Sequence, residues 1–208
     1  MSDQQSTDSK DSDRWNARFS EPGYAYGDQP NDFLHAACSG MAPGDALTLC
    51  EGEGRNAVYL AKLGFRVTAV DFSEVGLRKA NALAAEHGVA ITTIFADLTD
   101  FDPGIGKWDL VVAVFAQPPS ATRQRLYRQL QHCLRPGGAF VLEAKVEVGA
   151  TALDRYPGAA ILKDEIAPLE IRTISEQERQ LNEGRYHSGI QRTVQIMAVK
   201  PGPSKTMA

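Results

Sequence analysis

The chain has 208 residues, 43% of them hydrophobic, and carries a formal net charge of −4. That length suits one α/β domain with a full core and leaves no room for a second substrate domain. The negative net charge argues against sequence-independent binding of nucleic acid, which needs a basic surface. No stretch has the apolar length of a membrane span, and the start lacks the basic-then-apolar pattern of a signal peptide. We therefore expect a cytoplasmic protein without a membrane partner.

The three cysteines, Cys38, Cys50 and Cys133, are odd in number and form no C-x-x-C pair. We expect reduced, mostly buried thiols rather than a disulfide or a metal ligand set. The sequence thus predicts no metal site.

Two segments of different composition precede the first expected strand. Residues 1–13 are rich in Ser, Asp and Gln and lack aliphatic anchors, which predicts a disordered tail. Residues 14–30 then gather aromatic side chains around an arginine: Trp15, Arg18, Phe19, Tyr24 and Tyr26. This cluster could simply pack against the sheet edge. We favour a mobile lid that excludes water and holds a cation by cation–π attraction, because the cluster directly follows the tail.

From residue 31 to residue 144, expected helices alternate with expected strands. The strands are apolar runs at 46–50, 66–70, 91–95, 110–115 and 139–144. The helices are segments at 31–38, 55–63, 73–87 and 120–134. Ser73 is a suitable N-cap for the third helix, while Gly64 and Gly88 end the second and the third.

The alternation stops after this region. Residues 146–160 form an expected irregular insertion, whereas 170–181 and 190–200 are both rich in strand-forming residues, which predicts an antiparallel hairpin. The resulting fold class is a seven-stranded, mostly parallel α/β sheet with a C-terminal antiparallel hairpin and helices on both faces. We expect a single domain over residues 14–200 and a flexible C-terminus over residues 201–208.

The loop after the first strand carries the most informative residues. Gly52 and Gly54 open a helix there and Asp71 closes the next strand, as in the first βαβ unit of a nucleoside-binding sheet. Glu51 and Glu53 lie in the same loop. They would repel the pyrophosphate of a dinucleotide and attract the sulfonium and ammonium groups of S-adenosylmethionine (SAM), so the sequence favours SAM over NAD. The alternatives are a tight turn without chemical consequence and, above all for Glu53, a solvated loop charge.

Longer motifs around this loop resemble a known family. They are Glu51-Gly52-Glu53-Gly54-Arg55-Asn56-Ala57, Val67-Thr68-Ala69-Val70-Asp71-Phe72-Ser73 and the aromatic opening Trp15-Asn16-x-Arg18-Phe19-Ser20. These motifs resemble small bacterial SAM-dependent methyltransferases of the tellurite-resistance and thiopurine methyltransferase-like group. The segment Leu134-Arg135-Pro136-Gly137-Gly138 resembles the turn before the fifth strand of class I enzymes generally. The resemblance covers nearly the whole chain and implies the Rossmann-like class I methyltransferase fold.

The resemblance also implies a cofactor site for SAM. It places the methionine part against the glycine loop, the ribose hydroxyls on Asp71, and the adenine beside Phe72, with Asp97 and the Leu98 backbone at its edge. The expected cofactor-binding residues are Glu51, Gly52, Glu53, Gly54, Arg55, Asp71, Phe72, Ser73, Asp97, Leu98 and Val114. For Phe72 a core position, and for Asp97 a helix or turn cap, are the competing interpretations.

Two residues depart from the family's loop. Thr48 stands where an acid is usual on the first strand, and Cys50 stands where the first glycine is usual. We expect Glu51 to supply the missing carboxylate near the methionine ammonium.

Gln117, Tyr186 and His187 are the candidate catalytic residues. Gln117 and the two prolines after it resemble the Asn/Asp-Pro-Pro-aromatic motif of amino-methyltransferases, but Ser120 replaces the aromatic residue, which favours a simple helix-starting turn. Tyr186 and His187 lie near the expected hairpin tip. An exposed histidine is common at such a place, yet a pKa near neutrality would let His187 act as a general base.

The resemblance implies a SAM-dependent methyltransferase that acts on a small-molecule acceptor. Soft sulfur, selenium or tellurium nucleophiles fit best, because they need no general base and the sequence offers no evident catalytic dyad. Three alternatives stay open: an N- or O-methyltransferase of the same fold, a non-catalytic SAM-binding module, and an NAD(P)-dependent enzyme. We expect a monomer or a weak dimer without a nucleic-acid partner.

Overall fold

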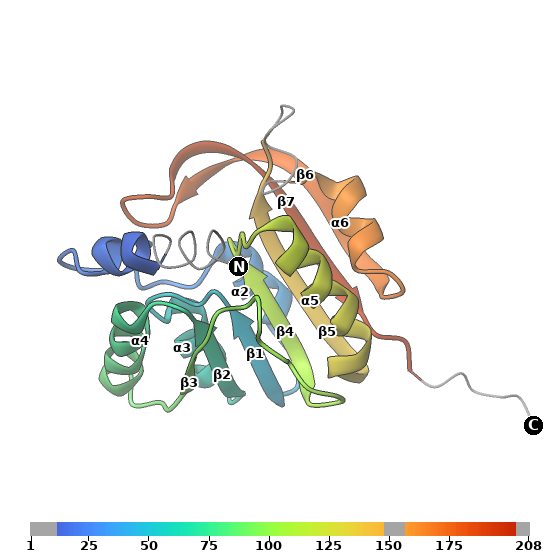
Figure 1. Ribbon diagram of the computed structural model, residues 1–208, viewed down its shortest axis with the longest axis horizontal. Coiled ribbons are helices and arrows are strands. Elements are labelled where there is room, and N and C mark those ends of the chain that lie inside the picture. Colours follow the sequence, from blue (N-terminus) through green and yellow to red (C-terminus); the bar gives the residue numbers. More distant parts are fainter. Residues whose placement is uncertain (1–11, 148–156, 203–208) are drawn as a thin grey trace, which may run out of the picture.

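The structure is a computed structural model that describes residues 12–147 and 157–202. The strands are β1 (Asp45–Leu49), β2 (Arg66–Asp71), β3 (Thr92–Phe95), β4 (Trp108–Val114), β5 (Leu134–Lys145), β6 (Glu170–Asn182) and β7 (Ser188–Val199). The helices are α2 (Asp32–Cys38), α3 (Arg55–Lys62), α4 (Glu74–Glu86), α5 (Ser120–Cys133) and α6 (Ala159–Glu165). Residues 12–19 form a further helical segment ahead of α2. Figure 1 shows this segment beyond the ends of the strands toward which the arrows point.

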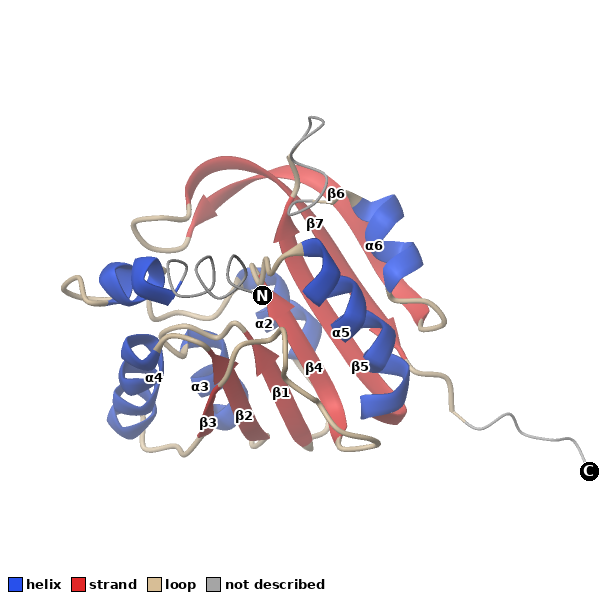
Figure 2. Ribbon diagram, viewed as in Figure 1, coloured by secondary structure: helices blue, strands red, loops and turns tan. Residues whose placement is uncertain are grey.

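The strands form one seven-stranded sheet in the order β3-β2-β1-β4-β5-β7-β6. Strands β3, β2, β1, β4 and β5 pair in parallel, whereas β7 runs antiparallel to both of its neighbours, β5 and β6. The predicted fold class is confirmed, including the C-terminal antiparallel hairpin (Figure 2).

Alternation along the strands divides the core between the two faces of the sheet. In β1, Leu47 and Leu49 belong to the cluster that packs against α5 and α6, whereas Ala46 belongs to the cluster that packs against α2 and α3. In β4, Val111 and Leu110 divide in the same way. Because helices cover both faces, the central strands β1 and β4 are mostly apolar and buried, as the sequence pattern indicated (Figure 1).

Helix starts follow the capping residues that the sequence offers. The Ser73 hydroxyl accepts the backbone N–H of Gly76 over 3.1 Å at the start of α4. The Asn31 side chain accepts the backbone N–H of Leu34 over 3.0 Å at the start of α2. Both interactions satisfy donors that a helix N-terminus otherwise leaves unpaired.

Three segments differ from the expectations. Residues 12 and 13 are helical, although they were assigned to a disordered tail; the rest of that tail lies outside the described residues. Helix α6 begins inside the segment expected to be irregular, most of which is also outside the described residues. Strand β5 begins at Leu134, so the expected turn before it is part of the strand, with a register shift opposite Trp108 and Leu110 and a left-handed φ of +82° at Gly137.

Within the described ranges, no helix combines the length and the apolar character needed to cross a membrane.

Candidate functional site

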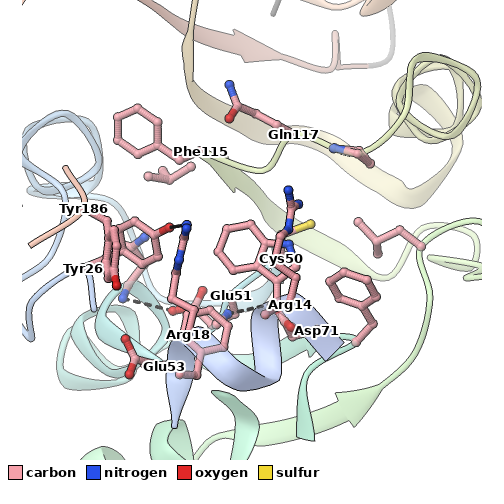
Figure 3. A pocket seen from close by; sticks show the side chains of 18 of the residues that line it. Arg14, Arg18, Tyr26, Cys50, Glu51, Glu53, Asp71, Phe115, Gln117 and Tyr186 are labelled. Atoms are coloured by element: carbon pink, nitrogen blue, oxygen red, sulfur yellow. Dashed lines mark hydrogen bonds between the residues drawn. The ribbon is translucent and has the colours of Figure 1, made fainter. Parts of the chain in front are cut away.

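A cavity of about 410 Å³ lies at the carboxyl edge of the sheet (Figure 3). Loops after β1, β2, β3 and β4 line it from below, and residues 14–27 together with the loop between β6 and β7 line it from above. Strands β1 and β4 are neighbours although β2 and β3 lie between them in sequence, so the strand order reverses here. Open α/β sheets bind ligands at such a point, in cavities of about 300–1,000 Å³.

The cavity brings together most of the residues that the sequence singled out. Gln117, Tyr186 and His187 all line it. The expected cofactor-binding residues that line it are Glu51, Gly52, Glu53, Arg55, Asp71, Phe72, Asp97, Leu98 and Val114. Gly54 and Ser73 do not.

Gly54 has a packing role instead. It is in the left-handed conformation at φ +94°, and a Cβ there would lie 2.6 Å from the Cα of Ala80 in α4. The glycine therefore permits the close approach of α3 to α4. Gly52 is covered differently: a Cβ on it would lie 3.0 Å from the ring of Phe19, so its backbone faces the N-terminal segment.

Cys50 occupies the position of the missing first glycine and keeps the backbone conformation that a glycine would adopt. Its φ is +52°, in the left-handed region that costs a non-glycine residue about 1–2 kcal/mol. Burial raises the pKa of its thiol, and the acidic Asp71 adds to this effect. The thiol is therefore protonated, and we assign it no chemical role.

Asp71 connects the end of β2 to the glycine loop. One carboxylate oxygen accepts the backbone N–H of Gly52 over 2.8 Å, and the other accepts that of Ser73 over 2.8 Å. Burial raises the pKa of Asp71 to about 6, against the lowering effect of these hydrogen bonds. The side chain is buried, and what remains accessible faces the cavity.

Glu51 caps α3. Its Oε1 accepts the backbone N–H groups of Asn56, over 3.1 Å, and Ala57, over 2.9 Å, a role that Gly54 cannot fill at the N-cap. Loss of solvation raises the pKa of Glu51 to about 7, although these two hydrogen bonds lower it. The expected carboxylate is thus present in the loop, and it is partly engaged by the helix.

Glu53 is not a solvated loop charge, so that interpretation is wrong. It is only 5% exposed, accepts the backbone N–H of Ala25 over 2.6 Å and forms an ion pair with Lys79. Lys79 in turn donates to the carbonyl oxygen of Phe19 over 2.8 Å. Glu53 and Lys79 therefore fix the N-terminal segment to α4, and the charge of Glu53 is compensated within the protein. The loop attracts a cation less strongly than its three acids alone suggested.

The expected adenine end of the cavity contains Phe72, Asp97 and Leu98. Asp97 accepts the backbone N–H of Thr99 over 2.7 Å, so it does cap a turn, as the competing interpretation held. The Leu98 carbonyl oxygen accepts a hydrogen bond from Arg125. Asp97 lines the cavity while it caps the turn. Contact of Phe72, Asp97 and Leu98 with adenine stays a prediction.

The aromatic residues of the N-terminal segment form a connected cluster over the cavity. The ring centroid of Trp15 lies 5.4 Å from that of Phe19 and 6.2 Å from that of Tyr26. Arg18 donates to the Tyr26 hydroxyl over 2.8 Å, and its guanidinium lies 5.2 Å from the Trp15 ring centroid. An internal arginine thus provides a cation–π partner for these rings. Tyr24 does not line the cavity.

The loop between β6 and β7 meets this segment from the other side. The Tyr186 hydroxyl donates to Glu21 over 2.6 Å. The centroid of its ring lies 4.3 Å from the Arg18 guanidinium (Figure 3). Gly184 lies so close to Gly27 that a Cβ on it would overlap the backbone there. Two regions more than 150 residues apart in sequence therefore close the cavity together.

His187 is buried rather than exposed, which corrects the expectation. Its ring centroid lies 4.2 Å from that of Phe115 and 4.5 Å from that of Tyr26. Burial, together with the nearby cations Lys145 and Arg55, lowers its pKa to about 3. Its Nδ1 has no hydrogen-bond partner among the described residues. A histidine with this pKa is neutral at physiological pH and is a poor general base.

The other two candidates differ in exposure. Tyr186 is 39% exposed, and its hydrogen bond to Glu21 raises its pKa. The Gln117 amide nitrogen is buried and has no hydrogen-bond partner among the described residues. Gln117, like His187, therefore has unused hydrogen-bonding capacity.

A buried polar network beneath the hairpin loop was not predicted. Glu143, which is fully buried in β5, accepts hydrogen bonds from Asn31 over 2.6 Å and Arg179 over 2.7 Å. Glu183 accepts one from Arg179 over 2.7 Å and one from Arg55 over 2.6 Å. The sequence signal that could have revealed this network is Glu143, an acid inside an apolar strand, because buried carboxylates are nearly always paired.

Metal ligands do not gather here: in the described part of the chain, no group of three or more His, Cys, Asp or Glu residues is arranged to hold a metal ion.

Comparison with known proteins shows which family the central region resembles. Residues 46–138 match the family model of the methyltransferase domain. This region, a little under half of the chain, is similar to methyltransferase domains. The ubiquinone biosynthesis O-methyltransferase of Caulobacter vibrioides is 29% identical over 160 residues, which make up 70% of this chain and 64% of that protein. The chain thus spans less than two thirds of that relative's length.

Solved structures agree on the architecture. The N-methyltransferase NodS from Bradyrhizobium japonicum, in complex with S-adenosyl-L-homocysteine (SAH), gives a TM-score of 0.69 at 15% identity over 91% of this chain and 98% of that one. TehB from Haemophilus influenzae gives 0.68 at 20% identity over 82% and 62%. The fold is the Rossmann-like fold of class I methyltransferases, whose cofactor is SAM.

The cavity has residues that fit this cofactor. Asp71 and Glu51 line the cavity, and neither has an ion-pair partner among the described residues. Burial raises the pKa of both carboxylates because it removes them from water. The ribose hydroxyls and the ammonium group of SAM are the donors that such carboxylates lack.

Proposed function

We propose that this protein transfers a methyl group from SAM to a small-molecule acceptor whose attacking atom is a soft nucleophile, such as a thiolate or its selenium or tellurium analogue. The observation that carries the proposal is that the part of the cavity left for the methyl acceptor offers no effective general base. His187 is its only imidazole among the described residues, and burial has lowered its pKa to about 3.

The cofactor would be held by the acidic half of the cavity. Asp71 would accept hydrogen bonds from the ribose, Glu51 would face the ammonium group, and Phe72 would border the adenine. When bound, SAM supplies an electrophilic methyl group on a sulfonium leaving group. The chain itself contributes alignment and exclusion of water by the N-terminal segment and the hairpin loop. Such positioning is worth about 7–11 kcal/mol.

Weak basicity near the acceptor favours a nucleophile that ionises by itself. An amine or hydroxyl acceptor has to lose a proton, and neither neutral His187 nor the protonated, hydrogen-bonded Tyr186 is suited to take it. A thiol with an ordinary pKa of about 8.5 supplies some thiolate near neutral pH. Alignment alone is then enough.

A phenol is the second candidate acceptor. It is favoured by the similarity to a ubiquinone biosynthesis O-methyltransferase, at 29% identity over 160 residues. The tellurite-resistance group remains part of the proposal, because TehB at 20% identity supports the fold alone. We also keep a cytoplasmic location and a monomeric or weakly dimeric state as expectations.

The test is transfer of a labelled methyl group from SAM to a panel of thiols, metalloid oxyanions, amines and phenols. The proposal expects thiols or their heavier analogues to be methylated fastest, with a rate that rises with pH as the acceptor ionises. Preference for phenols would select the second candidate. Tight SAH binding with no transfer to any acceptor would contradict both and leave a non-catalytic SAM-binding module.

A further inference from the structure

Acids line one end of the cavity and a lysine lines another, in addition to Arg14, Arg18 and Arg55. The acids Glu51, Asp71 and Asp97 follow β1, β2 and β3 and lie on the half that the proposed function assigns to SAM. The ends of β4 and β5 make the other half, and there Lys145 lines the cavity. No sequence motif pointed to this lysine.

Lys145 and Gln117 leave neighbouring strand ends. Strands β4 and β5 pair in parallel as far as Val114 and Glu143, and the backbone N–H of Phe115 donates to the Glu143 carbonyl oxygen over 2.6 Å. Lys145 lies two residues beyond Glu143, and Gln117 lies two residues beyond Phe115. The fold therefore brings an ammonium group and a primary amide to the same end of the cavity.

Neither group has its hydrogen-bonding capacity met by the protein. The Gln117 amide nitrogen is buried without a partner among the described residues, and the side-chain ammonium group of the partly buried Lys145 has no hydrogen bond or ion pair to any of them. Buried donors are almost always satisfied in folded proteins. A ligand with a hydrogen-bond acceptor would satisfy both the Gln117 amide and the Lys145 ammonium group.

The carboxylates nearest to this end are already occupied. Glu143 is paired with Arg179 and Asn31, and Glu183 is paired with Arg179 and Arg55. His187 is neutral, so it does not attract an anionic ligand or balance its charge. Among the described residues, no carboxylate forms an ion pair with Lys145.

We propose that the methyl acceptor carries a carboxylate or a similarly compact oxyanion, which pairs with Lys145 and accepts a hydrogen bond from the amide of Gln117. The rings of Phe115 and Tyr26 border the same space and would cover an apolar or aromatic body. This assignment rests on the proposed function, because it names the substrate class of the same cavity. Lys145 is a specificity residue in this scheme and takes no proton.

Binding to the SAH-loaded protein tests the assignment without requiring turnover. The probes are thiosalicylate and its methyl ester, and protocatechuate and its methyl ester, measured by calorimetry. The variants are Lys145→Gln, Lys145→Arg and, as a matched control, Lys62→Gln, which removes the same charge from the exposed far end of α3. We expect the acid of at least one pair to bind about tenfold or more tighter than its ester.

Lys145→Gln should remove that preference by weakening the acid alone, Lys145→Arg should keep most of it, and Lys62→Gln should change nothing. Equal binding of acids and esters to the parent protein, absence of binding by both acids, or equal losses for acid and ester in Lys145→Gln would overturn the assignment. Weakened SAH binding in Lys145→Gln would also overturn it, because the lysine would then hold the carboxylate of the cofactor.

Methyl transfer from labelled SAM to the same probes separates this assignment from the proposed function. Preference for the acids without any methyl transfer to the panel contradicts the proposed function alone. Methyl transfer that does not distinguish acid from ester contradicts the anion site alone.

Discussion

Asp71 accepts the backbone N–H of Gly52 over 2.8 Å across the mouth of the glycine loop. Its second oxygen accepts the N–H of Ser73. Each carboxylate oxygen can accept two hydrogen bonds, so both keep capacity toward the cavity. One side chain therefore sets the conformation of the loop and offers acceptors to a ligand, which makes loop geometry and ligand affinity depend on the same residue.

Removal of the Asp71 carboxylate should weaken SAH binding. We expect Asp71→Ala to cost about 1.5–3 kcal/mol of binding free energy, as for lost charge-assisted hydrogen bonds. Calorimetry on the folded variant measures this loss. Asp164→Ala, which removes an exposed acid from α6, should leave the affinity unchanged. An Asp71→Ala protein that binds SAH like the parent would remove Asp71 from the site.

Stability and SAH affinity should respond to pH in opposite directions. Folding raises the pKa of Asp71 from 3.8 to about 6 and that of Glu51 from 4.5 to about 7. A raised carboxyl pKa means that the folded state binds protons more tightly, so this contribution to stability is present below about pH 4 and is lost as pH rises through 6–7. The free energy of unfolding of the free protein should therefore carry a component that falls across this window.

SAH needs the ionised carboxylates, so its affinity should rise across the same window. The increase in Tm caused by a fixed SAH concentration is the measurement, taken at several pH values between 5 and 8. A shift that shrinks as pH rises would contradict the assignment of these acids to the cofactor.

Two substitutions at Glu51 separate its charge from its capping role. Glu51→Gln keeps an oxygen for the N–H groups of Asn56 and Ala57 but removes the charge. We expect its stability at pH 8 to equal or exceed that of the parent, with weaker SAH binding. Glu51→Ala also loses the cap and should be less stable than Glu51→Gln by about 0.5–2 kcal/mol. Chemical denaturation and calorimetry report the two effects; equal SAH affinity in the parent and Glu51→Gln would assign the residue to capping alone.

His187 should be dispensable as a base. Its pKa of about 3 keeps it neutral throughout the physiological range, so His187→Asn should retain methyl transfer to a thiol acceptor and the same pH profile. A general base contributes about 100-fold or more to the rate. A loss of that size, together with disappearance of an ionisation from the profile, would show that His187 accepts the proton after all.

The contact between the hairpin loop and the N-terminal segment can be tested with two glycines. Gly184 and Gly189 have similar left-handed φ angles, +76° and +85°, so alanine at either position costs about 1–2 kcal/mol through the backbone. Only at Gly184 would the new Cβ overlap the backbone of Tyr26 and Gly27.

We therefore expect Gly184→Ala to be the less stable variant and to weaken SAH binding, whereas Gly189→Ala should bind SAH normally. Thermal unfolding and calorimetry of both proteins provide the comparison. Equal behaviour of the two variants would mean that this contact is not needed to shape the cavity.

The sheet was predictable because its signals are local. Apolar runs, the Ser73 cap and the glycines around residues 52–54 each act over a few residues, and the right-handed βαβ connection leaves few ways to arrange them. The candidate site followed, because strand ends of a parallel sheet meet at one edge. Gly54 was assigned to the ligand, yet it permits helix packing, since sequence spacing does not distinguish the two uses.

The electrostatics of the site could not be read from the sequence. Glu53 is paired with Lys79, 26 residues away, and Glu143 with Arg179, 36 residues away, and nothing in the local pattern marks these partners. The pKa of His187 depends on burial between Phe115 and Tyr26, which only the packed hairpin loop produces. Charges and proton affinities depend on distant neighbours, so a count of loop acids overstated the attraction for a cation.

The ion pairs of Glu183 hold the hairpin loop, one wall of the cavity, in place. Swinging the hairpin loop outward would separate a buried carboxylate, 7% exposed, from Arg55 and Arg179, and separating such a pair costs about 3–5 kcal/mol. The links from Glu21 to Arg185 and Tyr186 are largely solvent-exposed and are worth about 1 kcal/mol or less each. Residues 12–22 are also held by Lys79, which donates to the carbonyl oxygens of Phe19 and Glu21. Buried ion pairs therefore fix the hairpin loop, and α4 fixes the N-terminal segment.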